Sequence, residues 1–177
     1  MTVKIFMPIA LAISFLLVSA CGETKGETKG ETKGAVKEVN LSLGKTAVES
    51  GFEKANSYNG MVDSVGANAI DGNKATRWSS DWKNDKDPNA AWMYVDLGQP
   101  TEIKRIDLYW EAAYALNYTI QVSDDAKNWT VVYEMKDNFK AQNYIKLPNP
   151  VTTRYVKLNC TKRATQYGYS LWEFQIY

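Results

Sequence analysis

Residues 103–110 read I-K-R-I-D-L-Y-W, a run in which apolar and polar side chains alternate. Successive side chains of a β-strand point to opposite faces of its sheet. The alternation therefore predicts a strand over Ile103–Trp110. Its inner face would carry Ile106, Leu108 and Trp110, with the polar residues between them pointing outward.

The same period of two recurs in short segments bounded by glycine, proline, asparagine or aspartate. In the last of these segments, Trp172, Phe174 and Ile176 share the expected inner face. About eight short strands with turn residues between them predict an all-β fold, either a sandwich or a barrel. Besides 103–110, the candidate strands are 45–49, 92–97, 118–123, 130–134, 143–147, 153–160 and 171–177.

The beginning of the chain differs from the rest in composition. Residues 1–20 have one early lysine and an apolar run that ends in small residues, which is the layout of a secretory signal peptide. Cys21 follows directly, and V-S-A-C resembles a bacterial lipobox, in which the cysteine carries the lipid. A signal that is simply cleaved is the alternative. Residues 21–39 hold three G-E-T-K repeats with nothing to bury, so we expect a disordered tether.

These features predict an exported protein, lipid-anchored to a bacterial membrane on its periplasmic side or at the cell surface. The membrane would be reached through the lipid anchor only, and the folded domain would be residues 40–177. Lipid on Cys21 leaves Cys160 without a disulfide partner. Cys160 shares the apolar face of the segment 153–160, so we expect it to pack in the core.

Charge and residue types exclude several functions. The formal net charge is +1, and a domain with balanced charge lacks the basic stripe expected for nucleic-acid binding. The chain has no histidine, which removes Ser-His and Cys-His nucleophiles and the commonest zinc ligand. A glycosidase would need two carboxylates on opposite sides of a cleft, and Glu111 and Asp81 could supply such a pair. Nothing in the sequence places these two residues across a cleft. We therefore expect no enzyme, and a monomer.

Residues 68–78 read N-A-I-D-G-N-K-A-T-R-W and concentrate oxygen donors around a glycine. Such a stretch suits a hard cation such as Ca²⁺, because Gly72 allows the backbone to bend sharply. A plain β-turn at Asp71-Gly72 is the alternative.

Several separated motifs together resemble the discoidin, or F5/8 type C, domain, whose bacterial branch is the family 32 carbohydrate-binding modules. The resemblance covers residues 40–177. It implies a jelly-roll β-sandwich, one structural Ca²⁺ and no catalytic activity. The motifs are N-A-I-D-G-N with T-R-W (68–78), W-M-Y-V-D-L-G (92–98), Y-T-I-Q-V-S-D-D with N-W-T (118–130), R-Y-V-K-L (154–158) and W-E-F (172–174).

The resemblance also implies a set of calcium ligands. Side-chain oxygens would come from Asp71, Thr76 and Glu173. Backbone carbonyls would come from positions near Asn68, Asn73 and Trp172.

Sugar recognition needs aromatic planes and a few fixed polar groups. The resemblance points to loops at Trp82, 110–117 and 163–169. We expect ring contacts from Trp82, Tyr114, Tyr167 and Tyr169, although Trp82 could instead cover the edge of the core. We expect Trp78, Trp92, Trp129 and Trp172 to lie in the core. Polar contacts are expected from Lys83, Glu111, Asn117 and Arg163.

The chain departs from the galactose-binding members, since it lacks histidine and has Glu111 where they offer an arginine. If Arg163 and Lys83 converge, an acidic sugar becomes plausible, because a guanidinium pairs bidentately with a carboxylate. The predicted function is a non-catalytic module that binds a galacto-configured or uronic-acid glycan such as polygalacturonate. An adhesion domain that holds a protein or lipid headgroup is the alternative.

Overall fold

The computed structural model describes residues 38–177, so the predicted signal peptide, Cys21 and nearly all of the predicted tether lie outside the described residues. Within these residues, seven antiparallel strands form the fold, with one short 3₁₀ helix, η1 (Gly66–Ala69). No helix in the described part of the chain is long and apolar enough to cross a bilayer. The strands are β1 (Thr46–Glu49), β2 (Trp78–Ser79), β3 (Ala91–Trp110), β4 (Ala115–Ser123), β5 (Thr130–Met135), β6 (Gln142–Arg163) and β7 (Ser170–Ile176).

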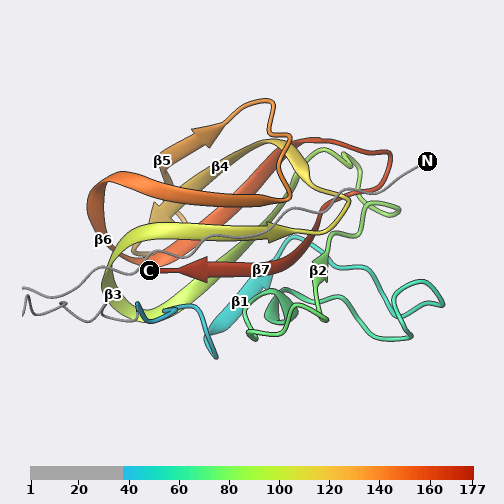
Figure 1. Cartoon of the computed structure of the whole chain (residues 1–177), viewed down its shortest axis with the longest axis horizontal. Coiled ribbons are helices and arrows are strands. Elements are labelled where there is room, and N and C mark those ends of the chain that lie inside the picture. The colour runs from blue at the N-terminus through green and yellow to red at the C-terminus, as the bar shows by residue number, and fades with distance from the viewer. Residues whose placement is uncertain (1–37) are drawn as a thin grey trace, which may run out of the picture. The chain divides into compact units, whose positions relative to one another are not determined.

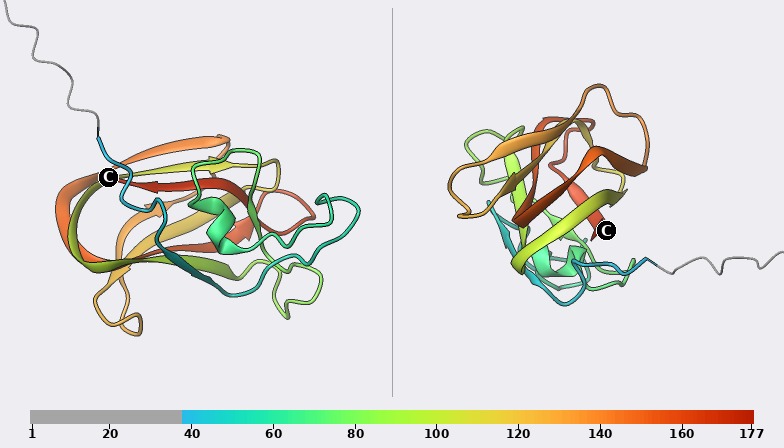
Figure 2. Two further views of the ribbon diagram at one scale, coloured as in Figure 1. Left: turned by 90° about the horizontal axis from the view of Figure 1, so that it is seen from below. Right: turned by 90° about the vertical axis from the view of Figure 1, so that its left-hand side faces the viewer.

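The strands are joined in the order β2-β7-β3-β6-β4-β5, and β1 pairs with β3. The first half of β3 pairs with β1 and with the second half of β6, whereas its second half pairs with β7 and the first half of β6. Both long strands curve round at one end of the molecule, so that the sheet folds over itself into two layers (Figures 1 and 2). The all-β jelly-roll sandwich predicted from the sequence is confirmed.

The number of strands differs from the prediction because of this curvature. The segments 92–97 and 103–110 are parts of one strand, β3, and the segments 143–147 and 153–160 are parts of β6. Gly98, at φ +87°, and Pro100 stand where β3 changes layers, and the register with β6 shifts there. Turn residues therefore mark a bend within a strand here, and not its end. The sequence pattern did not predict the two-residue strand β2.

The core lies between the layers and includes the inner face predicted for 103–110: Ile106, Leu108 and Trp110 are all buried. Cys160 is also buried, as expected, and burial raises the pKa of its thiol. The fully buried side chains of greatest volume are Trp78, Tyr118, Tyr169 and Phe174.

The last strand departs from the predicted alternation. Phe174 and Ile176 are buried, but Trp172 is only half-buried and Glu173 is fully buried. The pairing with β3 explains this, because Tyr109 faces Glu173 while Trp110 faces Leu171, which leaves Trp172 in a bulge. A bulge shifts the phase of the side chains beyond it. The prediction of Trp172 as a core residue is therefore wrong.

Two other tryptophans also lie outside the core. Trp92 stacks on Tyr94 with ring centroids 5.8 Å apart, and Trp129 meets the same tyrosine at 5.5 Å. Trp92 and Trp129 are half-buried on the outer surface. Of the four tryptophans predicted in the core, only Trp78 is there.

Candidate functional site

A cleft of about 230 Å³ lies among loops of the sandwich. These loops leave the strands at one end of the molecule (Figure 1). We call it the aromatic cleft. The loop after β1, the region around β2, the loop before β3, the turn after β3 and the loop before β7 all contribute to it. Its walls include Glu53, Arg77, Ser79, Trp82, Glu111, Ala113, Tyr167 and Ser170.

Two aromatic rings form one side of the aromatic cleft. Trp82 and Tyr167 meet edge to face, with ring centroids 5.6 Å apart and an interplanar angle of 84°. Tyr167 is 51% exposed, and Trp82 is half-buried. Rings held in this geometry offer an apolar surface together with a hydroxyl group.

Close backbone packing holds Trp82 in place. The Tyr169 amide donates to Ser80 Oγ at 3.0 Å, and the Ser80 amide donates to the Tyr169 carbonyl at 2.9 Å. A Cβ at Gly168 would lie only 2.6 Å from Trp82 Cβ, and it would also collide with Ser80 Oγ. The loop before β7 can therefore pass Trp82 at this distance only with glycine at position 168.

Charged groups line the rest of the aromatic cleft. Glu53 pairs with Arg77 across 3.6 Å and with Lys83 across 3.9 Å. Arg77 Nη1 also donates to Ser170 Oγ at 3.5 Å. Glu111 accepts from the Ala113 amide at 3.0 Å, while its own amide donates to the Ser170 carbonyl at 2.9 Å. The cleft thus holds two carboxylates in fixed positions.

The structure brings three of the predicted ligand-binding residues into the aromatic cleft: Trp82, Glu111 and Tyr167. Lys83 lies beside it, with Nζ 5.3 Å from the Trp82 ring. Tyr114 packs against the core.

The other two predicted polar residues have partners of their own. Asn117 Oδ1 accepts from the Asp137 amide at 3.0 Å, and Arg163 Nη1 donates to the Gln166 carbonyl at 2.8 Å. Neither lines the aromatic cleft.

Tyr169 does not offer its ring to a ligand, contrary to the prediction. It is fully buried, and its hydroxyl donates to the Asn89 carbonyl at 2.6 Å. Burial also raises the pKa of that hydroxyl. Tyr169 is therefore part of the core beneath the loops.

Sequence reasoning missed Glu53 and Arg77. Arg77 belongs to the T-R-W motif, which predicts part of the framework of the fold and not a ligand contact. Glu53 stands in a polar loop that matches none of the motifs. The one hint in the sequence was that Glu53 follows an isolated aromatic residue, Phe52. A carboxylate beside an aromatic residue is too common in loops to predict a binding site.

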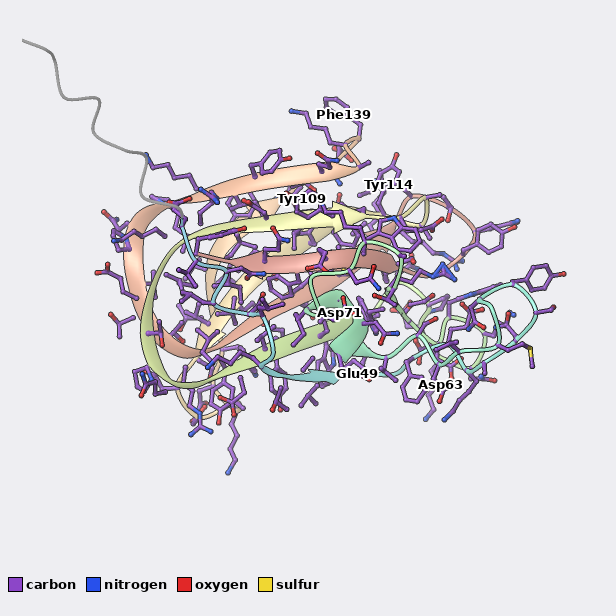
Figure 3. All side chains as sticks on the ribbon, turned by 60° about the horizontal axis from the view of Figure 1, so that its bottom comes forward. Glu49, Asp63, Asp71, Tyr109, Tyr114 and Phe139 are labelled. Atoms are coloured by element: carbon purple, nitrogen blue, oxygen red, sulfur yellow. The ribbon has the colours of Figure 1, made fainter. Side chains whose placement is uncertain are left out.

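The loop at 68–78 forms an oxygen-rich turn. Thr76 Oγ1 donates to Asp71 Oδ2 at 2.7 Å and lies 2.8 Å from the Asn73 carbonyl and 3.5 Å from the Asn68 carbonyl. Gly72 has φ +79°, a conformation that glycine adopts without a steric penalty. Figure 3 shows Asp71 close to η1.

Glu173 faces this turn from β7. It is fully buried, and its Oε1 has no hydrogen-bond partner within residues 38–177. Burial, and secondarily the charge of Asp71, raise the pKa of its carboxyl group. An orphaned carboxylate oxygen beside carbonyl, hydroxyl and carboxylate oxygens is a donor set that fits a hard cation.

Carboxylates alone are too few to hold a metal ion at this turn. No group of three or more His, Cys, Asp or Glu side chains is placed to hold a metal in the part of the chain that the structure describes. A cation at this turn would therefore need the carbonyls of Asn68, Asn73 and Trp172 and the hydroxyl of Thr76 besides Asp71 and Glu173. These are the residues predicted from the sequence, and they lie on two segments that β2 and β7 bring together.

Comparison with known proteins connects this architecture to carbohydrate-binding modules. The chain is 40% identical to chitosan-binding module 1 of a chitosanase/glucanase from Paenibacillus sp. IK-5, over 79% of this chain and 99% of that one, with a TM-score of 0.67. It is 39% identical to module 2 of that enzyme, solved with chitotriose, over 78% and 99%, with a TM-score of 0.68.

More distant structures share the fold. The family 32 module of NanJ from Clostridium perfringens, solved with galactose, is 18% identical over 74% of this chain and 91% of that one, with a TM-score of 0.61. A curated relative, the polysaccharide lyase 8 family protein HylA of Enterococcus faecalis, is 32% identical over 52% of this chain. The chain spans only 6% of that lyase.

The F5/8 type C domain pattern matches residues 45–174, which is most of the described chain. The match includes the loop at 68–78, the long strands β3 and β6, and β7 up to Phe174. The chain therefore belongs to the F5/8 type C domain family.

Proposed function

We propose that residues 40–177 form a non-catalytic module that binds glucosamine oligosaccharides of the chitosan type in the aromatic cleft. The observation that carries the proposal is the pair of fixed carboxylates, Glu53 and Glu111, beside the rings of Trp82 and Tyr167. Relatives about 40% identical over nearly their whole length are chitosan-binding modules, which supports the same ligand class here.

The chemistry of glucosamine suits these groups. Its amine titrates close to neutrality and is protonated in mildly acidic solution, where a carboxylate accepts a charge-assisted hydrogen bond from the ammonium group. The apolar face of a sugar ring packs on an aromatic plane. Arg77 keeps Glu53 oriented, and the backbone amide of Ala113 does the same for Glu111.

An acidic glycan fits this arrangement less well. The uronate hypothesis needed Lys83 and Arg163 to converge, yet Lys83 pairs with Glu53 and Arg163 donates to Gln166. A uronate in the aromatic cleft would meet Glu53 and Glu111, which have its own sign, and one guanidinium group, that of Arg77, which is already paired with Glu53. Like charges in close contact are costly. Galactose specificity likewise lacks a histidine or an added arginine to support it.

Isothermal titration calorimetry of the full chain tests the proposal. The ligands are the glucosamine trimer, its N-acetylated counterpart, a galactose disaccharide and an oligogalacturonate. We expect the glucosamine trimer to bind most tightly, with a modest affinity because a shallow cleft buries little area. Preferential binding of the oligogalacturonate or of galactose would refute the amino-sugar proposal. Binding of none of the four would favour the adhesion alternative.

We also propose that the turn at 68–78 and Glu173 hold a structural calcium ion. The buried, unpartnered Oε1 of Glu173 supports this, because an uncompensated buried charge is destabilising. A cation would offset that charge and tie β7 to the loop before β2. Calorimetric melting with calcium and with EDTA tests the proposal, and an unchanged melting temperature would refute it.

A further inference from the structure

A second hollow of about 280 Å³ lies next to the aromatic cleft. We call it the Trp172 hollow. It is formed between the loop 54–64 and the segment 75–77, and its walls include Tyr58, Val62, Asp63, Arg77 and Trp172. The hollow borders the proposed calcium turn through Asn68 and Thr76, but it lies outside the proposed sugar site.

Arg77 lines both the aromatic cleft and the Trp172 hollow. On one side its guanidinium group pairs with Glu53 at 3.6 Å and donates to Ser170 at 3.5 Å. On the other side its central carbon lies 5.9 Å from the Trp172 ring. The two concavities are therefore neighbours that share the side chain of Arg77.

The Trp172 hollow repeats the chemistry of the aromatic cleft. The bulge in β7 turns Trp172 away from the core and leaves it half-exposed. Tyr58 is 90% exposed at the tip of the loop. Asp63 supplies a carboxylate, whose Oδ1 accepts from the Ala55 amide at 2.8 Å.

The loop 54–64 is ordered by its own hydrogen bonds. Asn56 Oδ1 accepts from the Tyr58 amide at 2.8 Å and from the Asn59 amide at 3.2 Å. Asn56 Nδ2 donates to Glu53 Oε1 at 3.1 Å, so the loop is tied to a carboxylate of the aromatic cleft. At its base, the Ser64 amide donates to the Glu53 carbonyl at 3.0 Å.

We infer that the aromatic cleft and the Trp172 hollow form one groove that binds consecutive sugars of a single glucosamine chain. The inference rests on the proposed function. Two features identify the occupant: the two hollows adjoin at Arg77, which lines both, and each of them pairs aromatic rings with a carboxylate. Asp63 accepts from a further ammonium group, while Trp172 and Tyr58 pack against further sugar rings.

The length of the oligosaccharide ligand is the variable that tests this inference. Calorimetric titrations of the full chain compare the glucosamine trimer with the hexamer. The variants are Tyr58→Ala, which removes an exposed ring, and Asp63→Asn, which keeps an acceptor for the Ala55 amide but removes the charge. Phe139→Ala is the matched control, because Phe139 is 80% exposed and lies far from Asp63 (Figure 3).

We expect wild type to bind the hexamer more tightly than the trimer. Each test variant should lower hexamer affinity by about three- to tenfold, whereas trimer affinity should change by less than about twofold. The control should match wild type with both ligands. A melting curve of each variant separates loss of binding from loss of folding.

Two outcomes overturn the inference and leave the proposed function standing: equal affinity of wild type for trimer and hexamer, or unchanged hexamer affinity in both test variants. Failure of wild type to bind either oligomer is a different result. It would overturn the proposed function itself, and this inference with it.

Discussion

Arg77 and Glu53 form an ion pair, with Nη2 3.6 Å from Oε2, although one precedes β2 and the other follows β1. Their side chains are only 20% and 15% exposed. An ion pair shielded from water restrains both partners more than one on an open surface does. Arg77 thereby fixes the direction in which Glu53 presents its carboxylate to the aromatic cleft.

Glu53→Gln should lower affinity for the glucosamine trimer by about tenfold, because the ligand's ammonium group then meets an uncharged amide instead of a carboxylate. Affinity for the N-acetylated trimer should stay nearly constant, since that ligand brings no ammonium group. Glu134→Gln on β5 is the control, because Glu134 pairs only with Lys136, at 3.2 Å, on the surface. Equal losses for both ligands would argue against an ammonium contact.

Trp82→Ala should abolish measurable trimer binding, because the variant loses the largest ring of the aromatic cleft. Its melting temperature should fall only slightly, since Trp82 is half-buried in a loop. Trp129→Ala removes an indole of similar exposure on the outer surface, where it contacts Tyr94. Calorimetric titration should show that this second variant binds like wild type; a comparable loss in both would locate the sugar elsewhere.

Gly168→Ala should weaken sugar binding although it removes no polar group of the aromatic cleft. The added Cβ would meet Trp82 Cβ at 2.6 Å, and two carbons cannot approach so closely. Trp82 and the loop before β7 must then move apart. We expect at least about a tenfold loss of affinity and a cost of about 1–3 kcal/mol in unfolding free energy, measured by urea denaturation. Gly98→Ala, which has open space around it but φ +87° and lines neither hollow, controls for a purely backbone effect.

Removal of calcium should lower the melting temperature of wild type, because Glu173 is then left as a buried charge beside Asp71. Glu173→Gln should melt at the same temperature with calcium and with EDTA. In EDTA this variant should be at least as stable as wild type, since it lacks the buried charge. A calcium response that survives in the Gln variant would place the ion elsewhere.

The pair Asp96–Arg154 should give a stability contribution that is lost in acid. Arg154 donates two hydrogen bonds to Asp96, at 2.8 and 2.9 Å, and these hold the pKa of Asp96 below its ordinary value of 3.8. A lowered carboxyl pKa stabilises the fold above the unfolded-state pKa, and this stabilisation disappears as the pH falls through the folded-state pKa.

Asp96→Asn should therefore melt below wild type at pH values above 3.8, and the difference should shrink as the pH falls further. The two side chains are 22% and 39% exposed, so the effect is modest. Melting curves across the acid range measure it. A difference that is the same at every pH would mean that packing, and not charge, connects β3 to β6 here.

The sequence by itself determined the fold class and much of the framework. Alternation of side chains is a local property, because each residue of a strand faces the side opposite its neighbours. The turn at Asp71-Gly72 is equally local, since the positive φ of Gly72 follows from the residue type. Motifs from Trp92 to Gly98 and from Arg154 to Leu158 were recognised separately, and their residues Asp96 and Arg154 meet in the structure.

Only the tertiary structure decided which side chains share a surface. The bulge opposite Trp110 moved Trp172 out of the core and Glu173 into it, and such a shift depends on the partner strand. Glu53, Arg77, Trp82 and Tyr167 come from separate loops, in which side-chain direction follows no period. They converge because β3 and β6 bend from one layer to the other and bring those loops to one end of the sandwich.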